Sequence, residues 1–329
     1  MRYSLIIPVY NRPDEVDELL DSLTKQHFQD FEVLVVEDGS SVPCESVVDR
    51  YADLLNIHYL RKPNSGPGQT RNFGAERSRG EYLLILDSDC VLPPDYLDAV
   101  EEELRREPAD AFGGPDRAHD SFTRVQKAIN YAMTSFFTTG GIRGGKKKMD
   151  KFYPRSFNMG VRRDVYQALG GFSKMRFGED IDFSIRIFKA GYRCRLFPEA
   201  WVWHKRRTGW RKFFKQVYNS GIARINLYKK YPESLKLVHT LPALFTLGVC
   251  AILLSSWLFP WSLSLLLVFV LVILIDASIR NKSLFIGVLS VIAAFIQLIG
   301  YGTGFLSAWW KRCVCKEGEF AAFEKNFYQ

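Results

Sequence analysis

The sequence predicts an α/β protein with a doubly wound, mostly parallel sheet, followed by C-terminal transmembrane helices. Two observations lead to this fold class. Short apolar runs alternate with segments of helical periodicity over the first third of the chain, which is typical of strands joined by crossover helices. Residues 241–310 are nearly all apolar, and stretches of this length predict helices able to cross a bilayer.

The elements expected in the α/β part follow one another along the chain. In the helix expected at 14–26, Val16, Leu19 and Leu23 share one face, which would pack on the sheet. Strands are expected at residues 4–7, 31–36, 57–60, 82–86 and 200–203, and helices at 14–26, 46–54, 68–78, 96–106, 121–137, 164–169 and 179–190. Residues 138–150 are rich in Gly and Lys and predict a loop.

The C-terminal third has a different composition. Mean hydropathy is only −0.09 although 47% of the 329 residues are hydrophobic, because charged sequence precedes the apolar stretches. Residues 210–228 predict a basic, amphipathic helix at a membrane surface. Residues 241–259 and 261–279 each predict a transmembrane span. Residues 284–310 would either cross the membrane or turn back at the glycines of 300–304. The alternative for all three segments is that they are buried helices of a soluble core. We expect an α/β domain at 1–204, a juxtamembrane region at 205–236 and two to three transmembrane helices in 237–329.

The formal net charge of +8 is concentrated in Lys146, Lys147 and Lys148 and in residues 205–215. Basic runs can bind nucleic acid or anionic lipid. The chain has no zinc-finger, helix-turn-helix or RNA-binding signature, so we expect membrane lipids and no nucleic acid as partners. The six cysteines lack the spacing of a disulfide framework and are expected to be reduced, and no signal peptide precedes the first strand.

Two carboxylates follow the apolar run at 82–86. Asp87 and Asp89 are one residue apart where the predicted strand ends. Ligands of open α/β sheets bind at the carboxyl ends of strands, and paired carboxylates there can hold a divalent cation that binds a diphosphate. A polar turn after the strand is the alternative, and the neighbouring motifs bear on which of the two holds.

Four groups of motifs occur in a fixed order. They are Ile7-Pro-Val-Tyr-Asn11; Val35-Val-Glu-Asp-Gly-Ser40; Gly66 with Thr70-Arg-Asn72 and Asp87-Ser-Asp89; and Asn158-Met-Gly160 with Gly170-Gly-Phe172 and Gly178-Glu-Asp-Ile-Asp182. Together they resemble the family 2 glycosyltransferases over roughly residues 4–221. The resemblance implies the GT-A fold, a nucleotide-diphospho-sugar donor and transfer with inversion at the sugar.

The resemblance also implies which residues bind the donor nucleotide. Pro8, Tyr10 and Asn11 would form the first strand-end loop that lines the nucleotide. Asp38 matches the family's acidic residue that accepts a hydrogen bond from the base, which a carboxylate can do. Arg71 matches an arginine that faces the nucleotide, and a surface ion pair is its alternative role.

The metal site implied by the resemblance is formed by Asp89, Asp87 and His204. Asp89 is expected to contact Mn²⁺ or Mg²⁺, and Asp87 to reach the ribose or a metal-bound water. His204 resembles a histidine that completes the metal or diphosphate site in some related enzymes, and imidazole suits Mn²⁺. A structural histidine is the alternative.

Glu179 and Asp180 resemble the family's acidic pair at the start of the helix on the acceptor side. Inverting transfer needs a base for the acceptor hydroxyl, and Asp180 is expected to be that base because a helix N-terminus favours the ionised carboxylate. Capping of this helix is the alternative, and Asp182 and Arg186 are expected to form a supporting ion pair. The Gln-x-x-Arg-Trp motif of processive members is absent from the corresponding stretch at 216–220, which favours addition of a single sugar.

These features favour a membrane-anchored inverting glycosyltransferase of cell-surface polysaccharide or glycolipid synthesis. It would move one sugar from a nucleotide-diphospho-sugar to a lipid-linked or membrane-proximal acceptor, with its catalytic domain in the cytosol and several passes through the inner or plasma membrane. Transfer to a polyprenyl phosphate is an alternative. A non-catalytic membrane scaffold is a further alternative, and it predicts the loss of metal or base carboxylates.

Overall fold

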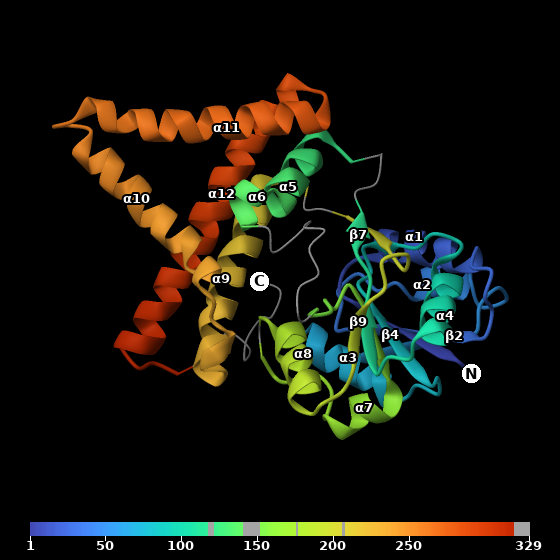
Figure 1. Cartoon of the computed structure of the whole chain (residues 1–329). Coiled ribbons are helices and arrows are strands. Elements are labelled where there is room, and N and C mark those ends of the chain that lie inside the picture. The colour runs from blue at the N-terminus through green and yellow to red at the C-terminus, as the bar shows by residue number, and fades with distance from the viewer. Residues whose placement is uncertain (118–121, 141–151, 176, 206–207, 319–329) are drawn as a thin grey trace. The chain divides into compact units, whose positions relative to one another are not determined.

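The computed structural model describes residues 1–117, 122–140, 152–175, 177–205 and 208–318, which form two compact units (Figure 1). The first unit takes the described residues within Met1–His119 and Met149–Lys205, and the second takes those within Asp120–Lys148 and Arg206–Ala321. The grouping differs from an uninterrupted domain at 1–204, because residues 122–140 contact the C-terminal helices instead of the sheet. The loop expected at 138–150, including its three consecutive lysines, lies outside the described residues from residue 141 on.

A seven-stranded mixed sheet forms the first unit, in the order β3-β2-β1-β4-β8-β6-β9. Strands β3, β2, β1 and β4 run parallel, and β8 is antiparallel to both β4 and β6. The bounds of these strands are β1 Tyr3–Val9, β2 Phe31–Asp38, β3 Ile57–Lys62, β4 Tyr82–Leu86, β6 Ala111–Gly113, β8 Asn158–Arg162 and β9 Cys194–Leu196. A smaller sheet follows the order β5-β10-β7, with β5 Cys90–Val91, β10 Val202–His204 and β7 Asp116–Arg117.

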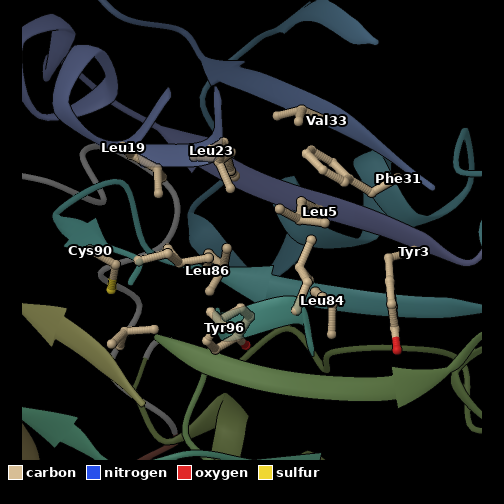
Figure 2. Packing of buried hydrophobic residues seen from close by; sticks show 14 of the residues in the cluster. Tyr3, Leu5, Leu19, Leu23, Phe31, Val33, Leu84, Leu86, Cys90 and Tyr96 are labelled. Atoms are coloured by element: carbon tan, nitrogen blue, oxygen red, sulfur yellow. The ribbon is translucent and has the colours of Figure 1, made fainter. Parts of the chain in front are cut away.

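Helices cover both faces of the larger sheet. Alternate residues of β1 point to opposite faces: Leu5 packs with α1, α2 and α4, while Ile6 packs with α3, α7 and α8. Figure 2 shows the first face, where Leu5 and Leu84 lie beside Leu19 and Leu23 of α1. These helices are α1 Pro13–Thr24, α2 Glu45–Asp49, α3 Pro67–Ala75, α4 Tyr96–Arg106, α7 Arg163–Ala168 and α8 Glu179–Lys189. Burial on both faces explains why β1 is apolar along nearly its whole length.

The second unit is helical throughout its described residues. Helix α5 begins with a capping box between Thr123 and Gln126, and its Ile129 packs with Phe213 of α9 and Ala293 of α12. The α-helices are α5 Arg124–Thr134, α6 Phe136–Thr139, α9 Trp210–Lys230, α10 Leu241–Ser255, α11 Leu263–Asn281 and α12 Leu284–Trp309. Short 3₁₀ turns lie at Pro232–Ser234, Leu237–His239 and Pro260–Ser262, and a π-helical turn at Trp310–Val314 follows α12.

Glycines allow α9 and α12 to approach each other closely. A Cβ atom on Gly221 of α9 would overlap the carbonyl oxygen of Tyr301, and one on Gly304 of α12 would overlap that of Tyr218. Neighbouring helices occupy the space that side chains at these glycines would need. Helix α12 continues unbroken through residues 300–304. The bend that these glycines could have permitted is not present.

Two helices of this unit are long and apolar enough to cross a membrane, namely Pro260–Asn281 and Leu284–Val314. The span expected at 241–259 is wrong in length, because α10 ends at Ser255 after 15 residues. At a rise of 1.5 Å per residue it is about 22 Å long, less than the roughly 30 Å of a hydrocarbon core.

Candidate active site

The loops that follow β1 and β2 are tied together at the carboxyl edge of the sheet. The backbone N–H of Asn11 donates to Ser40 Oγ at 2.8 Å, and Asn11 Oδ1 accepts from the backbone N–H of Val42 at 2.9 Å. Asn11 has a φ of +53°, a backbone conformation that asparagine tolerates better than most residues. Pro8 is buried within β1, whereas Tyr10 is partly exposed and Asn11 is exposed at the strand end.

Asp38 lies at the end of β2, completely buried. Its Oδ1 accepts from Lys62 Nζ at 2.6 Å and from the Ser65 N–H at 2.9 Å, and its Oδ2 accepts from the Gly66 N–H at 2.9 Å. These contacts hold the loop at Ser65 and Gly66, which leads into α3, so Asp38 fixes the conformation of this loop. Its expected contact with the base stays a prediction.

Asp89 and His204, which are far apart in sequence, lie side by side. His204 pairs with Cys90 across β10 and β5, and its Nε2 lies 3.2 Å from Asp89 Oδ1. The imidazole stacks on Phe157, and its buried Nδ1 has no hydrogen-bond partner among the described residues. Ligand atoms of Asp89, Cys90 and His204 all lie within 4.8 Å of one another. Burial raises the pKa of the Cys90 thiol. Because carboxylate oxygen and imidazole suit Mn²⁺ better than thiol sulfur does, Asp89 and His204 are the metal-binding candidates.

Arg71 bridges two carboxylates that the sequence placed in different roles. Its Nη2 donates to Asp87 Oδ1 at 2.8 Å, and its Nη1 donates to Glu179 Oε1 at 3.1 Å. The guanidinium is buried and lies over the ring of Phe172. Burial and the adjacent Asp180 raise the pKa of Glu179 to about 7, against the opposing effect of Arg71. Glu179 can therefore hold a proton near neutral pH.

Asp180 occupies the first turn of α8 and is paired with Arg155. Its Oδ2 accepts from Arg155 Nε at 2.6 Å, and its Oδ1 accepts from the backbone N–H of Ile181 at 2.8 Å. Although burial opposes ionisation, Arg155 and this backbone N–H lower the pKa of Asp180. Two neighbouring carboxyls thus have pKa values shifted in opposite directions, which suits one of them to act as a base.

The structure brings Asp87, Glu179 and Asp180 together around Arg71, and it brings Asp89 and His204 together as a pair. Two further participants, Arg12 and Arg155, were not predicted from the sequence. Arg12 Nη1 donates to Asp89 Oδ2 at 2.9 Å, as Arg155 does to Asp180. Arg12 directly follows Asn11 of the first motif, and this position was the signal that could have identified it.

Comparison with protein families gives one match that covers half of the chain. Residues 4–170 match the model of a family described as "Glycosyl transferase family 2". A protein of Bacillus subtilis (strain 168), described as probable glycosyltransferase YdaM, is 26% identical over 227 residues, covering 65% of this chain and 53% of that protein. Poly(ribitol-phosphate) beta-N-acetylglucosaminyltransferase TarS of Staphylococcus aureus (strain Mu50 / ATCC 700699) is 40% identical over 101 residues, 30% of this chain and 18% of TarS. The chain thus spans about half the length of YdaM and less of TarS.

A solved structure resembles the chain over nearly its whole length. Mannosyltransferase PcManGT from Pyrobaculum calidifontis, in complex with GDP-Man and Mn²⁺, gives a TM-score of 0.67 at 17% identity. The match covers 94% of this chain and 88% of the other. At this identity the likeness concerns the fold.

Proposed function

The chain belongs to glycosyl transferase family 2, and from this premise we propose that it transfers one sugar, with inversion, from a nucleotide-diphospho-sugar to a lipid-linked or membrane-proximal acceptor. One observation carries the proposal. Four carboxylates and three arginines converge in the first unit, in the ion pairs Asp89–Arg12, Asp87–Arg71–Glu179 and Asp180–Arg155. A scaffold without activity has no need for so many partly buried charges, which are costly to desolvate.

Asp89 and His204 fit a Mn²⁺ or Mg²⁺ ion that would hold the donor diphosphate. They offer one carboxylate oxygen and one imidazole nitrogen close together, a donor set that suits Mn²⁺ in particular. When bound, the cation supplies positive charge that neutralises the departing nucleoside diphosphate. Asp87, held by Arg71, would bind the donor ribose, while Pro8, Tyr10, Asn11 and Asp38 would line the rest of the nucleotide site.

Asp180 would accept the proton of the acceptor hydroxyl as that oxygen attacks the anomeric carbon. Its lowered pKa keeps it ionised at neutral pH, and α8 directs its N-terminal backbone dipoles toward it. Glu179, with its raised pKa, would carry a proton beside it and limit the repulsion between the two carboxyls. Asp180 is therefore the base, and Glu179 serves the site through Arg71.

Membrane anchoring is supported by the exposure of apolar side chains in the second unit. Only 17% of the most apolar stretch of Pro260–Asn281 is buried, whereas a core helix of a soluble protein would be mostly covered. Leu254 is 80% and Trp257 89% exposed around the α10–α11 turn, and exposed apolar surface of this extent favours a lipid environment. An anchor would raise the effective concentration of a lipid-linked acceptor at the active site.

Release of nucleoside diphosphate from a panel of UDP- and GDP-sugars by the purified full chain in detergent tests the proposal. We expect release that depends on Mn²⁺ or Mg²⁺, is stopped by EDTA and increases when a polyprenyl-linked glycan is added. In Asp180→Asn, transfer should fall at least about a hundredfold while donor binding persists. Asp164→Asn is the matched control, because Asp164 also pairs with an arginine at 2.6 Å but its side chain is exposed and lies outside the site. Undiminished transfer by Asp180→Asn would refute the base assignment, and acceptance of polyprenyl phosphate alone would favour that alternative acceptor.

A further inference from the structure

Arg12 occupies a position that the sugar-transfer reaction, as proposed above, does not yet explain. It stands at the N-cap of α1 without capping the helix through its side chain. Its Nη1 instead donates to Asp89 Oδ2 at 2.9 Å, while Asp89 Oδ1 lies 3.2 Å from His204 Nε2. Both oxygens of the candidate metal-binding carboxylate are thus engaged by the protein itself.

A divalent cation that binds Asp89 must compete with Arg12 for this carboxylate. The guanidinium and a metal ion on one carboxylate repel each other, so binding of the metal weakens the hold of Asp89 on Arg12. The other carboxylate that Arg12 contacts is Glu15, at the longer distance of 3.5 Å and one helical turn away. The side chain of Arg12 is about one-third exposed, at 32%, and therefore has room to move.

We propose that Arg12 is an internal counter-ion of the metal-binding carboxylate, and that it transfers to the donor diphosphate when metal and nucleotide bind together. The proposal rests on the proposed function, because it requires a metal at Asp89. Among the three arginines of the site, Arg71 is 4% exposed and held between Asp87 and Glu179, and Arg155 is paired with the candidate base. Arg12 is the one attached to the metal carboxylate, and its planar fork of donors matches phosphate oxygens.

Arg12→Gln, which removes the charge and keeps most of the side-chain length, should change two affinities in opposite directions. Without nucleotide, Mn²⁺ should bind about fivefold more tightly than to the wild type, the scale of one partly exposed ion pair. In the presence of Mn²⁺, UDP and GDP should bind about tenfold more weakly, the scale of one charge-assisted hydrogen bond. Loss of the signal of free Mn²⁺ in electron paramagnetic resonance measures the first affinity, and titration calorimetry measures the second.

Arg50→Gln is the matched control, because Arg50 also pairs with a carboxylate, Asp17, at 2.9 Å, but on the surface outside the site. It should alter neither affinity. Arg12→Lys should restore the competition with Mn²⁺ but recover only part of the nucleotide affinity, because lysine lacks the planar fork. A general defect in folding would weaken both ligands, so it cannot imitate the expected opposite changes.

Three results would overturn the role of Arg12. Equal Mn²⁺ affinity of the wild type and Arg12→Gln would refute the competition while leaving the metal site intact. Unchanged affinity for UDP and GDP would refute the transfer to the diphosphate. Absence of Mn²⁺ binding by both proteins, with or without nucleotide, would overturn both the metal site and the role of Arg12, and so separates the failure of the proposed function from that of this inference.

Discussion

Replacing Arg155 by glutamine should move the acidic limb of the pH–rate profile to higher pH. Arg155 Nε lies 2.6 Å from Asp180 Oδ2 and lowers the pKa of the candidate base. An opposite charge at this distance typically shifts a carboxyl pKa by one to three units, and the lower end applies because Arg155 is 40% exposed and thus screened by water. We therefore expect the apparent pKa for kcat/KM to rise by about one unit in Arg155→Gln.

The direction follows from which form of Asp180 is active. The ionised carboxylate accepts the proton, so a higher pKa means that activity is lost at a higher pH as the solution is acidified, while activity well above this pKa is retained. The assay is nucleoside diphosphate release from about pH 2.5 to pH 8.5, at low donor and acceptor concentrations, because the lowered pKa of Asp180 puts the wild-type acidic limb at low pH. Arg162→Gln is the control, because Arg162 makes an equally short pair with Asp164, whose side chain is exposed and lies outside the site. An acidic limb that stays in place, or moves to lower pH, would contradict the assignment of Asp180 as the base that Arg155 tunes.

Three further outcomes follow from the site and the helix packing. Asp89→Ala should abolish Mn²⁺-dependent transfer while leaving the fold intact, and full activity would exclude Asp89 as a metal ligand. Glu179 has a raised pKa, so the folded protein binds its proton more tightly than the unfolded chain and stability falls as pH rises from about 4.5 to 7. In Glu179→Gln the melting temperature should depend less on pH over this range. An unchanged slope would argue against a proton on Glu179. Gly221→Ala should destabilise the second unit by about 1–3 kcal/mol, because the new Cβ meets the Tyr301 carbonyl. Gly248→Ala is the control, because its Cβ meets open space beside α10 and should not destabilise the unit. Equal thermal stability of the two variants would contradict the close packing.

Much of the fold could be predicted because its signals are local. The strand at 82–86 and the helix at 96–106 lie where the sequence placed them, and the α/β fold class is confirmed by the family match and by the solved mannosyltransferase. The expected pair of Asp182 and Arg186 is also formed, since it needs only one helical turn. Helix ends were less predictable: α2 ends at Asp49, because turns replace helical hydrogen bonds through residue 54.

The site was only partly predictable, because its ion pairs join residues distant in sequence. Arg12 and Asp89 are separated by 77 positions, and Arg155 and Asp180 by 25. Apart from the position of Arg12 directly after the first motif, no local pattern distinguishes an arginine that enters such a site from one that remains at the surface. The grouping of 122–140 with the C-terminal helices was missed for the same reason, because Ile129 finds its partners in α9 and α12.

The close pairing of α9 with α12 bears on where the basic tail lies. Contacts from Gly221 to Tyr301 and from Asn226 to Arg312 run in the same direction along both helices, so α9 lies beside the C-terminal half of α12. Placing charged side chains inside hydrocarbon is costly. Helix α9 carries five exposed basic side chains: Arg211, Lys212, Lys215, Lys229 and Lys230.

We therefore expect the C-terminal half of α12 to stay beside α9 near the headgroups, although the whole helix is long and apolar enough to cross a membrane. The tail residues Lys311 and Arg312 would then lie on the same side of the membrane as α9, as the positive-inside rule predicts and a third crossing would not allow. In that arrangement α11 would be the helix long enough to cross the lipid, beside the shorter α10.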